Sequence, residues 1–110
     1  MRKIYSTPEY QIFYNSLSDR VKNKIEYSIY ILKEIPVVST KLVKKLINTN
    51  LYELRISVDN EYRIILFCMD NENIINATKI IFLSGFVKKS TKDYGKQIKQ
   101  AETILNNLKP

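Results

Sequence analysis

Two arginines, Arg55 and Arg63, have the residue type and spacing that most directly suggest chemistry in this 110-residue chain. They lie in two segments, 51–58 and 62–69, where apolar and polar residues alternate as on a half-buried strand. A three-residue hairpin loop over 59–61 would place both arginines on one face and leave the opposite face continuously apolar, whereas a two-residue loop would send them to opposite faces. We expect the three-residue loop. Adjacent guanidinium groups repel unless an anion lies between them, and their planar forks suit phosphate oxygens.

Three more charged residues can join this pair. Glu53 precedes Arg55 by two positions, so it shares a strand face with it and could accept a proton or simply neutralise the arginine. Lys88 and Lys89 follow a third predicted strand and Gly85, where the chain can turn and bring an ammonium group towards the arginine face. A solvated loop is the ordinary alternative for such a lysine pair.

Tyr94 lies in or just before the last predicted helix and could stack on a nucleobase or donate a proton. Because the chain has eight tyrosines, packing is the common role for any one of them, and we assign five others to the core or its margin: Tyr5, Tyr27, Tyr30, Tyr52 and Tyr62. Six lysines are candidates for sequence-independent attraction of RNA phosphates. They are Lys41, Lys44 and Lys45 in the middle of the chain and Lys92, Lys96 and Lys99 near its end.

Composition narrows the chemistry further. Eighteen Lys and Arg against eleven Asp and Glu give a net charge of +7, which is typical of nucleic-acid binders, although anionic membranes and acidic proteins could also attract it. The absence of histidine excludes His-based zinc sites and Ser-His or Cys-His nucleophile pairs, and we expect no metal or cofactor.

The single Cys68 lies in an apolar run and is expected to be a buried hydrophobe. Short apolar stretches and a first segment without an apolar signal region favour a cytoplasmic protein without a membrane span.

The hydrophobic pattern predicts an α+β fold in one domain, 1–110. We expect an N-terminal helical hairpin packed on a small antiparallel sheet, with a C-terminal helix after the sheet. Thr7 and Ser18 are predicted helix caps. The apolar faces of the three helices are predicted at Ile12, Phe13 and Leu17, at Val21, Ile25, Ile29 and Leu32, and at Ile98, Ala101, Leu105 and Leu108. The sheet is predicted to combine a short strand over 2–6 with a meander of strands over 51–58, 62–69 and 74–83. An irregular or briefly helical connector is predicted over 37–50.

Three segments together resemble the HigB-like branch of the RelE/ParE type II toxin superfamily: 51–55 (LYELR), 62–64 (YRI) and 84–89 (SGFVKK), the last before an amphipathic helix. The resemblance covers about 51–101. It implies the toxin half of a bacterial toxin-antitoxin pair, a ribonuclease that cleaves mRNA, often in the ribosomal A site, and is silenced by a cognate antitoxin. A helix-turn-helix protein encoded next to the toxin is the expected antitoxin.

The same resemblance implies that Arg55, Arg63 and Lys88 or Lys89 hold the scissile phosphate and that Tyr94 matches the C-terminal tyrosine of RelE-type sites. The chain departs from the pattern at two of its residues: Ser84 stands where the branch commonly has histidine, and Glu53 stands where RelE has a lysine. The loop before the last helix also lacks the common proline.

The expected reaction is metal-independent cleavage in which the ribose 2′-hydroxyl attacks the adjacent phosphorus. Glu53 would accept the 2′-hydroxyl proton, and Lys89 or Tyr94 would protonate the leaving oxygen. Two alternatives stay open from the sequence: a ParE-like toxin that inhibits DNA gyrase and cleaves nothing, and a basic RNA-binding module without catalysis.

Overall fold

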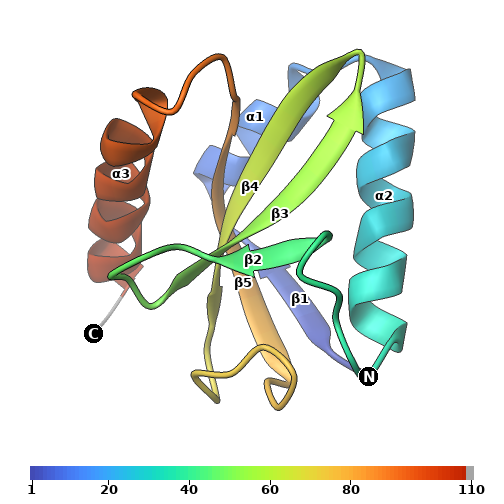
Figure 1. The fold of residues 1–110 in the computed structure, drawn as a ribbon, viewed down its shortest axis with the longest axis vertical. Helices are drawn as coiled ribbons and strands as arrows, with labels where there is room; N and C mark the ends of the chain where they lie inside the picture. Colours follow the sequence, from blue (N-terminus) through green and yellow to red (C-terminus); the bar gives the residue numbers. More distant parts are fainter. Residues whose placement is uncertain (109–110) are drawn as a thin grey trace.

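The computed structural model describes residues 1–108 and shows a five-stranded mixed sheet with helices on both faces (Figure 1). The strand order is β1-β5-β4-β3-β2, with β1 parallel to β5 and the other neighbours antiparallel. The elements are β1 (Lys3–Ser6), α1 (Pro8–Asn15), α2 (Asp19–Glu34), β2 (Val43–Lys45), β3 (Leu51–Val58), β4 (Asn60–Cys68), β5 (Lys79–Val87) and α3 (Asp93–Leu108). The predicted α+β architecture is confirmed, but the sheet is mixed and not wholly antiparallel, because the N-terminal strand β1 pairs in parallel with β5 at its edge.

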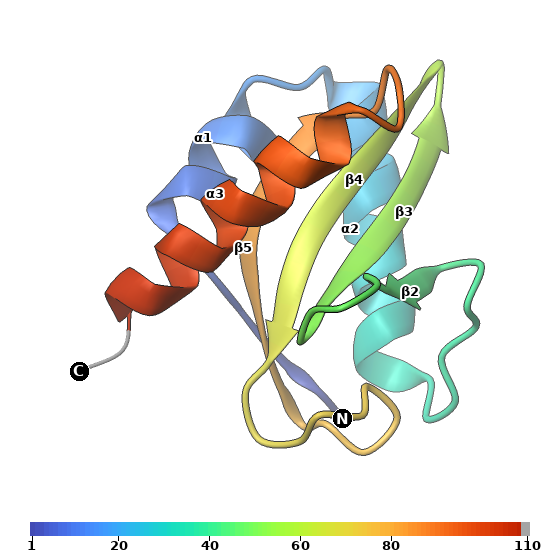
Figure 2. The ribbon, with the colours of Figure 1, turned by 60° about the vertical axis from the view of Figure 1, so that its left-hand side comes forward.

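Helices α1 and α2 lie against one face of the sheet and α3 lies across the other, in front of β5 when the molecule is turned (Figure 2). Each face has its own apolar cluster. The larger cluster packs between the sheet and the two N-terminal helices, and the smaller one packs under α3. No helix within residues 1–108 has the length and apolar character required to cross a membrane.

The β3–β4 hairpin is tighter than expected. Val58 pairs with Asn60, so one residue, Asp59, makes the turn in a left-handed conformation with φ of 63°. The predicted three-residue loop is therefore wrong, but the change of two positions preserves the parity of the two strands. Arg55 lies directly opposite Arg63, and the expectation that both share one face is confirmed.

Two other boundaries differ from the prediction. The third strand of the meander begins at Lys79 rather than at residue 74, because the Asp70 carboxylate accepts backbone hydrogen bonds from Thr78 (2.9 Å) and Lys79 (3.1 Å) and closes a loop there. The connector over 37–50 is not wholly irregular. It contributes β2, whose Val43 pairs with Leu54 at the edge of the sheet.

The predicted caps are confirmed. Thr7 accepts a hydrogen bond from the Tyr10 amide (3.0 Å), and Ser18 accepts one from the Val21 amide. The Thr7 hydroxyl also donates to the Leu83 carbonyl (2.6 Å), at a bulge where Leu83 has no partner on β4. The start of α1 is thereby attached to the strand below it.

The helix faces are mostly as predicted. On α2 the predicted stripe faces the core, whereas on α1 the buried residue is Tyr10 and Ile12 is 72% exposed, because the helix turns Tyr10, Phe13 and Tyr14 to the core. On α3, Leu108 is exposed and Ile104 packs inward instead. Of the five tyrosines assigned to the core, Tyr52 and Tyr62 are buried, but three are exposed: Tyr5, Tyr27 and Tyr30.

Two buried polar residues complete the fold. Cys68 is 5% exposed, as expected, and burial raises the pKa of its thiol to about 12. Arg2 is also buried, which the sequence did not indicate. Its guanidinium donates to five backbone carbonyls, including those of Leu32 and Ile35 at the end of α2 and that of Ile74 in the β4–β5 loop. This one side chain satisfies the open end of a helix and fixes a loop to it.

Candidate nucleic-acid interface

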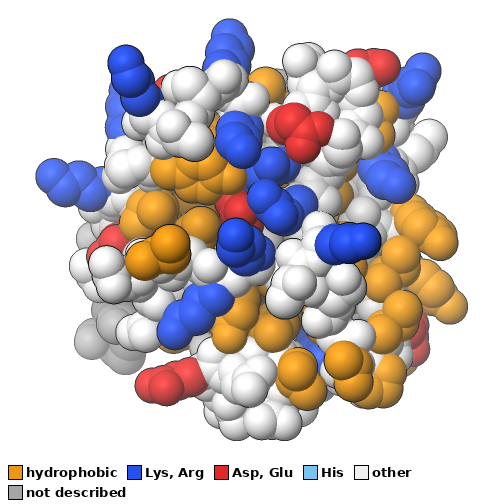
Figure 3. All heavy atoms as spheres, in the orientation of Figure 1, with side chains coloured by type: hydrophobic (Ala, Val, Ile, Leu, Met, Phe, Trp, Pro, Cys, Tyr) orange, Lys and Arg blue, Asp and Glu red, His pale blue; other side chains and the backbone are white. Residues whose placement is uncertain are grey.

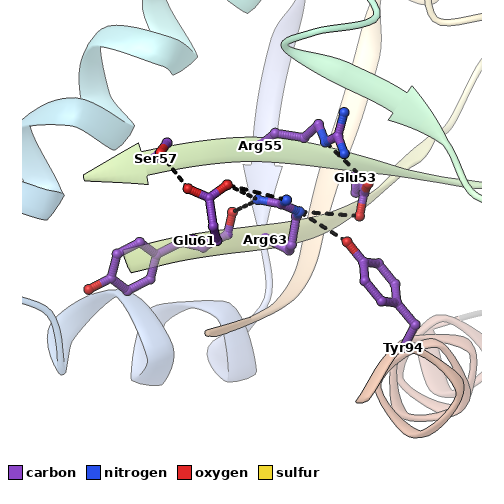
Figure 4. A network of polar contacts seen from close by, with 7 residues as sticks. Glu53, Arg55, Ser57, Glu61, Arg63 and Tyr94 are labelled. Atoms are coloured by element: carbon purple, nitrogen blue, oxygen red, sulfur yellow. Dashed lines mark hydrogen bonds and ion pairs between the residues drawn. The ribbon is translucent and has the colours of Figure 1, made fainter. Parts of the chain in front are cut away.

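Lys and Arg side chains gather around a small acidic patch in the middle of one face, over β2 and β3 (Figure 3). Within this region four sequence-predicted residues come together: Glu53 and Arg55 from β3, Arg63 from β4 and Tyr94 from the first turn of α3 (Figure 4). They lie on the side of the sheet that α3 covers. Strand alternation places them there, because the intervening residues Leu54, Ile64 and Tyr62 belong to the opposite apolar cluster.

Glu53 lies between the two arginines. Its Oε1 is 3.4 Å from the Arg55 Nε, and its Oε2 is 3.7 Å from the Arg63 Nε. The side chain is 5% exposed, and Oε2 has no hydrogen-bond partner among residues 1–108. The alternative interpretation, in which Glu53 neutralises Arg55, therefore describes a real ion pair, but the carboxylate is shared with Arg63. One buried anion holds two cations on neighbouring strands.

Arg63 is 3% exposed, and its donors are largely committed. The Nε group donates to the Tyr94 hydroxyl (3.0 Å), and one Nη1 hydrogen bond goes to the Tyr62 carbonyl (3.0 Å). The remaining contacts of Nη1 and Nη2 are with the Glu61 Oε1, each at 3.5 Å. The guanidinium plane is thus fixed, and its outer edge faces Glu61.

Arg55 differs from Arg63 in its freedom. Its side chain is 34% exposed, and apart from the ion pair with Glu53 it makes no side-chain hydrogen bond within the described part of the chain. The two arginines therefore offer an anion one rigid fork and one adjustable fork, side by side.

Tyr94 connects α3 to the arginines. Its ring contacts Phe86 edge-on, with centroids 5.5 Å apart, and the Lys88 Nζ lies 5.7 Å from the ring centroid. Burial raises the pKa of the Tyr94 hydroxyl above its usual value, and the neighbouring Glu53 carboxylate raises it further. The hydroxyl therefore keeps its proton at neutral pH. It accepts a hydrogen bond from Arg63, and its own hydrogen can be donated to the Glu53 carboxylate or to a ligand.

A hollow of about 310 Å³ opens beside the arginines. It is lined by Lys41, Arg55, Ile56, Ser57, Glu61 and Arg63. Sequence reasoning placed Glu61 in the turn and gave it no role. The signal that could have identified it is the alternation itself, since Glu61 precedes Arg63 by two positions, as Glu53 precedes Arg55.

Glu61 pairs with Ser57 across the hairpin, and the Ser57 hydroxyl donates to its carboxylate. This hydrogen bond is the main reason that the pKa of Glu61 lies below its usual value, with smaller contributions from Arg63 and Lys88. The side chain is 48% exposed. Glu61 is therefore a charged group at the rim of the hollow at neutral pH.

The lysines divide into those near the hollow and those away from it. Lys41 lines it, and Lys44 pairs with Glu53 in the strand register, so it shares the face of the arginines, whereas the adjacent Lys45 alternates to the other side. Lys88 is half-buried, and its amide donates to the Glu61 carbonyl (2.7 Å), while Lys89 is exposed.

The α3 lysines do not line the arginine hollow. Lys96 and Lys99 instead line a separate hollow of about 800 Å³ between α3, β5 and α1, and Lys92 is exposed just before α3. The predicted group of six lysines is therefore spread over more than one part of the surface.

Gly85 does not make the expected turn, and the neighbouring Ser84 is buried. The chain does not turn at Gly85, because β5 continues to Val87. Glycine is required there for packing: a Cβ atom would lie 2.3 Å from the Phe13 ring on α1. Ser84 is 9% exposed, and its hydroxyl has no hydrogen-bond partner among residues 1–108. Within the same residues there is no cluster of three His, Cys, Asp or Glu side chains that could hold a metal ion.

Comparison with solved structures identifies the fold as RelE-like. The structure of a double arginine-to-alanine mutant of the E. coli toxin RelE in the free state matches with a TM-score of 0.64, at 13% identity, over 90% of this chain and 96% of that one. The crystal structure of the isolated E. coli RelE toxin in its P21 form matches with a TM-score of 0.63, at 13% identity, over 91% of this chain and 98% of that one. At this identity the likeness shows the fold.

The family is shown by sequence. Residues 13–106 match the model of the family described as phage derived protein Gp49-like, and the chain belongs to this family. No curated protein matches the chain at a significant level.

Proposed function

We propose that the protein is the toxin of a bacterial type II toxin-antitoxin pair, of the HigB-like branch, and that it is a metal-independent endoribonuclease acting in the cytoplasm on translated mRNA. The single domain, 1–110, would carry the whole activity. The observation that supports this most strongly is the direct cross-strand pairing of Arg55 with Arg63 beside an open hollow. The RelE-like fold and the Gp49-like family are consistent with it.

In the proposed reaction the ribose 2′-oxygen bonds to phosphorus while the bond to the 5′-oxygen breaks. The products are a 2′,3′-cyclic phosphate and a 5′-hydroxyl. Arg55 and Arg63 stabilise the charge that develops on the phosphoryl oxygens, and one such donor is worth about 3–4 kcal/mol. Tyr94, which keeps its proton at neutral pH, donates it to the leaving 5′-oxygen.

Glu53 has a different part in this proposal from the one expected. The side chain is 5% exposed and wedged between two guanidinium groups, so a 2′-hydroxyl could reach it only after the cluster opened. We assign Glu53 to positioning the arginines, and the 2′-hydroxyl proton passes to solvent. Lys88, beside the Tyr94 ring, adds positive charge near the leaving group.

The exposed lysines would attract the rest of the RNA. Lys41 and Lys44 lie on the arginine side, so they suit phosphates next to the scissile one. The other lysines offer weaker attraction to more distant RNA or to the ribosome: Lys45, Lys89, Lys92, Lys96 and Lys99. A cognate antitoxin, expected to be a helix-turn-helix protein encoded nearby, would silence the activity.

The test uses purified protein with mRNA on translating ribosomes. Wild-type protein should produce fragments with cyclic-phosphate ends, and Arg55→Ala should slow their formation by about 10²- to 10³-fold. Arg20→Ala is the matched control, because it also removes one arginine, whose side chain is 74% exposed and pairs with Asp59 on the surface. Equal rates for Arg55→Ala and wild type would contradict the proposal.

Growth measurements separate this function from the ParE-like alternative. The protein would be a ParE-like toxin if induced Arg55→Ala still arrests growth while mRNA stays intact and DNA gyrase is inhibited. If neither growth nor RNA responds to the wild-type protein, a non-catalytic RNA-binding module is the correct interpretation.

A further inference from the structure

Glu61 lies where an incoming phosphate would have to lie. Its carboxylate contacts the outward Nη1 and Nη2 groups of Arg63, each at 3.5 Å. The Ser57 hydroxyl, across the hairpin, holds the carboxylate in this position (Figure 4). All three residues line the hollow beside the arginines.

The donors that Glu61 covers are the ones that Arg63 has left for a ligand. Nε is used by Tyr94, and one Nη1 hydrogen bond is used by the Tyr62 carbonyl. What remains is the outer edge of the fork, formed by Nη1 and Nη2. Carboxylate and phosphate oxygens compete for this edge, because both accept hydrogen bonds from a guanidinium fork.

Charge supports the same conclusion. Arg55 and Arg63 carry two positive charges, and Glu53 and Glu61 carry two negative charges, so the four residues that form ion pairs here are neutral as a group. A phosphate that approaches while Glu61 is in place meets a like charge in direct contact with Arg63. Displacement of Glu61 from the fork uncovers a net positive charge on the remaining three.

The two carboxylates differ in their freedom to move. Glu53 is 5% exposed and contacts both arginines, whereas Glu61 is 48% exposed and its contacts with Arg63 are at the long limit of a hydrogen bond. Glu61 also follows the turn residue Asp59 by only two positions, at the end of the hairpin. It is therefore the carboxylate that an incoming phosphate can displace into solvent, at the loss of its long contacts with Arg63 and of its hydrogen bond from Ser57.

We propose that Glu61 sets the RNA affinity of the site by occupying the phosphate position on Arg63 in the free protein, so that an RNA phosphate must displace it to bind. This inference rests on the proposed function in taking Arg63 as a phosphate-binding residue. It adds that, without RNA, the phosphate position on Arg63 is covered by the Glu61 carboxylate. Glu61 thereby discriminates against weakly held single phosphates and in favour of RNA that also contacts the surrounding lysines.

The experiment measures binding of a single-stranded RNA with 2′-O-methyl groups, which lacks the attacking hydroxyl and stays intact. Glu61→Gln keeps the shape of the side chain and removes its charge, and fluorescence anisotropy at low salt should show binding tighter by on the order of fivefold to tenfold. The matched control is Glu34→Gln, at the exposed end of α2, which changes the net charge equally and should alter affinity by less than about twofold.

A second readout follows displacement directly. Titration of inorganic phosphate into wild-type protein and Glu61→Gln, followed by the NMR signal of the Arg63 guanidinium, should show a response at lower phosphate concentration in the variant. Equal affinities of Glu61→Gln and Glu34→Gln for the RNA would overturn the inference. So would a loss of cleavage in Glu61→Gln without tighter binding, because that result makes Glu61 a proton acceptor.

The two proposals can fail separately. Tighter binding by Glu61→Gln together with no cleavage of ordinary mRNA by wild-type protein would support the covered phosphate site and reject the ribonuclease. Normal cleavage by wild-type protein, with no change in RNA binding by Glu61→Gln, would support the ribonuclease and reject the covered phosphate site. A thermal unfolding curve of Glu61→Gln that overlays the wild type excludes a folding defect as the cause of either result.

Discussion

The two faces of the β3–β4 hairpin come from the same two strands, but one face is apolar and buried and the other carries the charged candidate site. Towards α1 and α2 the hairpin presents Leu54, Ile56 and Ile64, each no more than 1% exposed. Towards α3 it presents the arginines and glutamates of the candidate site, separated from those apolar residues by a single position. Two helices seal the first face, while α3 covers only part of the second and leaves the turn end of β3 and β4 open (Figure 2).

The comparison shows that burial alone does not distinguish core from site. Arg63 is 3% exposed, which matches many residues of the apolar face. It tolerates this burial because Tyr94, Tyr62 and two carboxylates satisfy its donors. The apolar face gains stability from packing, and the charged face depends on each member having its partner.

The largest effect is expected from Arg63→Ala, which removes the buried cation at the centre of the charged face. The buried Glu53 carboxylate would lose one of its two cations, so the free energy of unfolding should fall by about 3–5 kcal/mol, and cleavage should fall by at least about 10²-fold. Urea unfolding and the cleavage assay measure the two losses. Arg55→Ala is the comparison and should lose activity with a smaller stability loss, about 1 kcal/mol, because water can replace its partly exposed guanidinium beside Glu53. Wild-type stability of Arg63→Ala would show that the cluster is not held together as described.

Leu54→Ala should damage the other face alone. Leu54 is fully buried, so its truncation should lower the free energy of unfolding by about 2–5 kcal/mol. Cleavage per folded molecule should stay within a few-fold of wild type, because the arginines keep their contacts. Ile47→Ala, at a position 82% exposed, is the control and should change stability by less than about 0.5 kcal/mol. A large activity loss in folded Leu54→Ala would show that the two faces are coupled.

The two glycines provide a smaller contrast. Gly85→Ala should lower the free energy of unfolding by about 1–3 kcal/mol, because the new Cβ would meet the Phe13 ring at 2.3 Å. Gly95→Ala, in α3 with nothing within 4 Å of the added Cβ, should instead stabilise the protein by about 0.5–1 kcal/mol. Thermal unfolding of both variants tests the pair, and adding Phe13→Leu to Gly85→Ala should recover part of the loss. Equal effects of the two alanines would argue against the close α1–β5 contact.

The last expected effect appears only at alkaline pH. Burial raises the pKa of the Cys68 thiol from 9.0 to about 12, so the unfolded chain releases this proton first. The resulting stabilisation is complete below about pH 9 and is lost as the pH rises towards about 12. The free energy of unfolding should therefore decline above pH 9, and less steeply in Cys68→Ala. An identical decline in both proteins would show that the thiol is not buried in the neutral form.

Local patterns predicted much of this fold because their physical causes are local. Thr7 and Ser18 cap helices through hydrogen bonds to amides three residues ahead. The α2 stripe follows from helical periodicity, and the shared face of Arg55 and Arg63 follows from strand parity. These features need no knowledge of distant residues.

The features that were missed depend on which groups meet once the chain is folded. The hairpin closes on Asp59 alone, and the start of β5 is set by Asp70 accepting from Thr78 and Lys79. Tyr27 and Tyr30 are exposed because the sheet takes the opposite side of α2. Composition and periodicity carry no signal for such choices.

By itself, the sequence determined which residues are basic, which are apolar and which of them alternate, because these properties belong to each residue and its near neighbours. Tertiary structure alone decided that Glu53 lies between two arginines, that Tyr94 reaches Arg63 from α3 and that Arg2 closes the end of α2. The contacts of Tyr94 with Arg63 and of Arg2 with Ile35 join residues 31 and 33 positions apart in the chain, and only the packed sheet and helices bring them within hydrogen-bond distance.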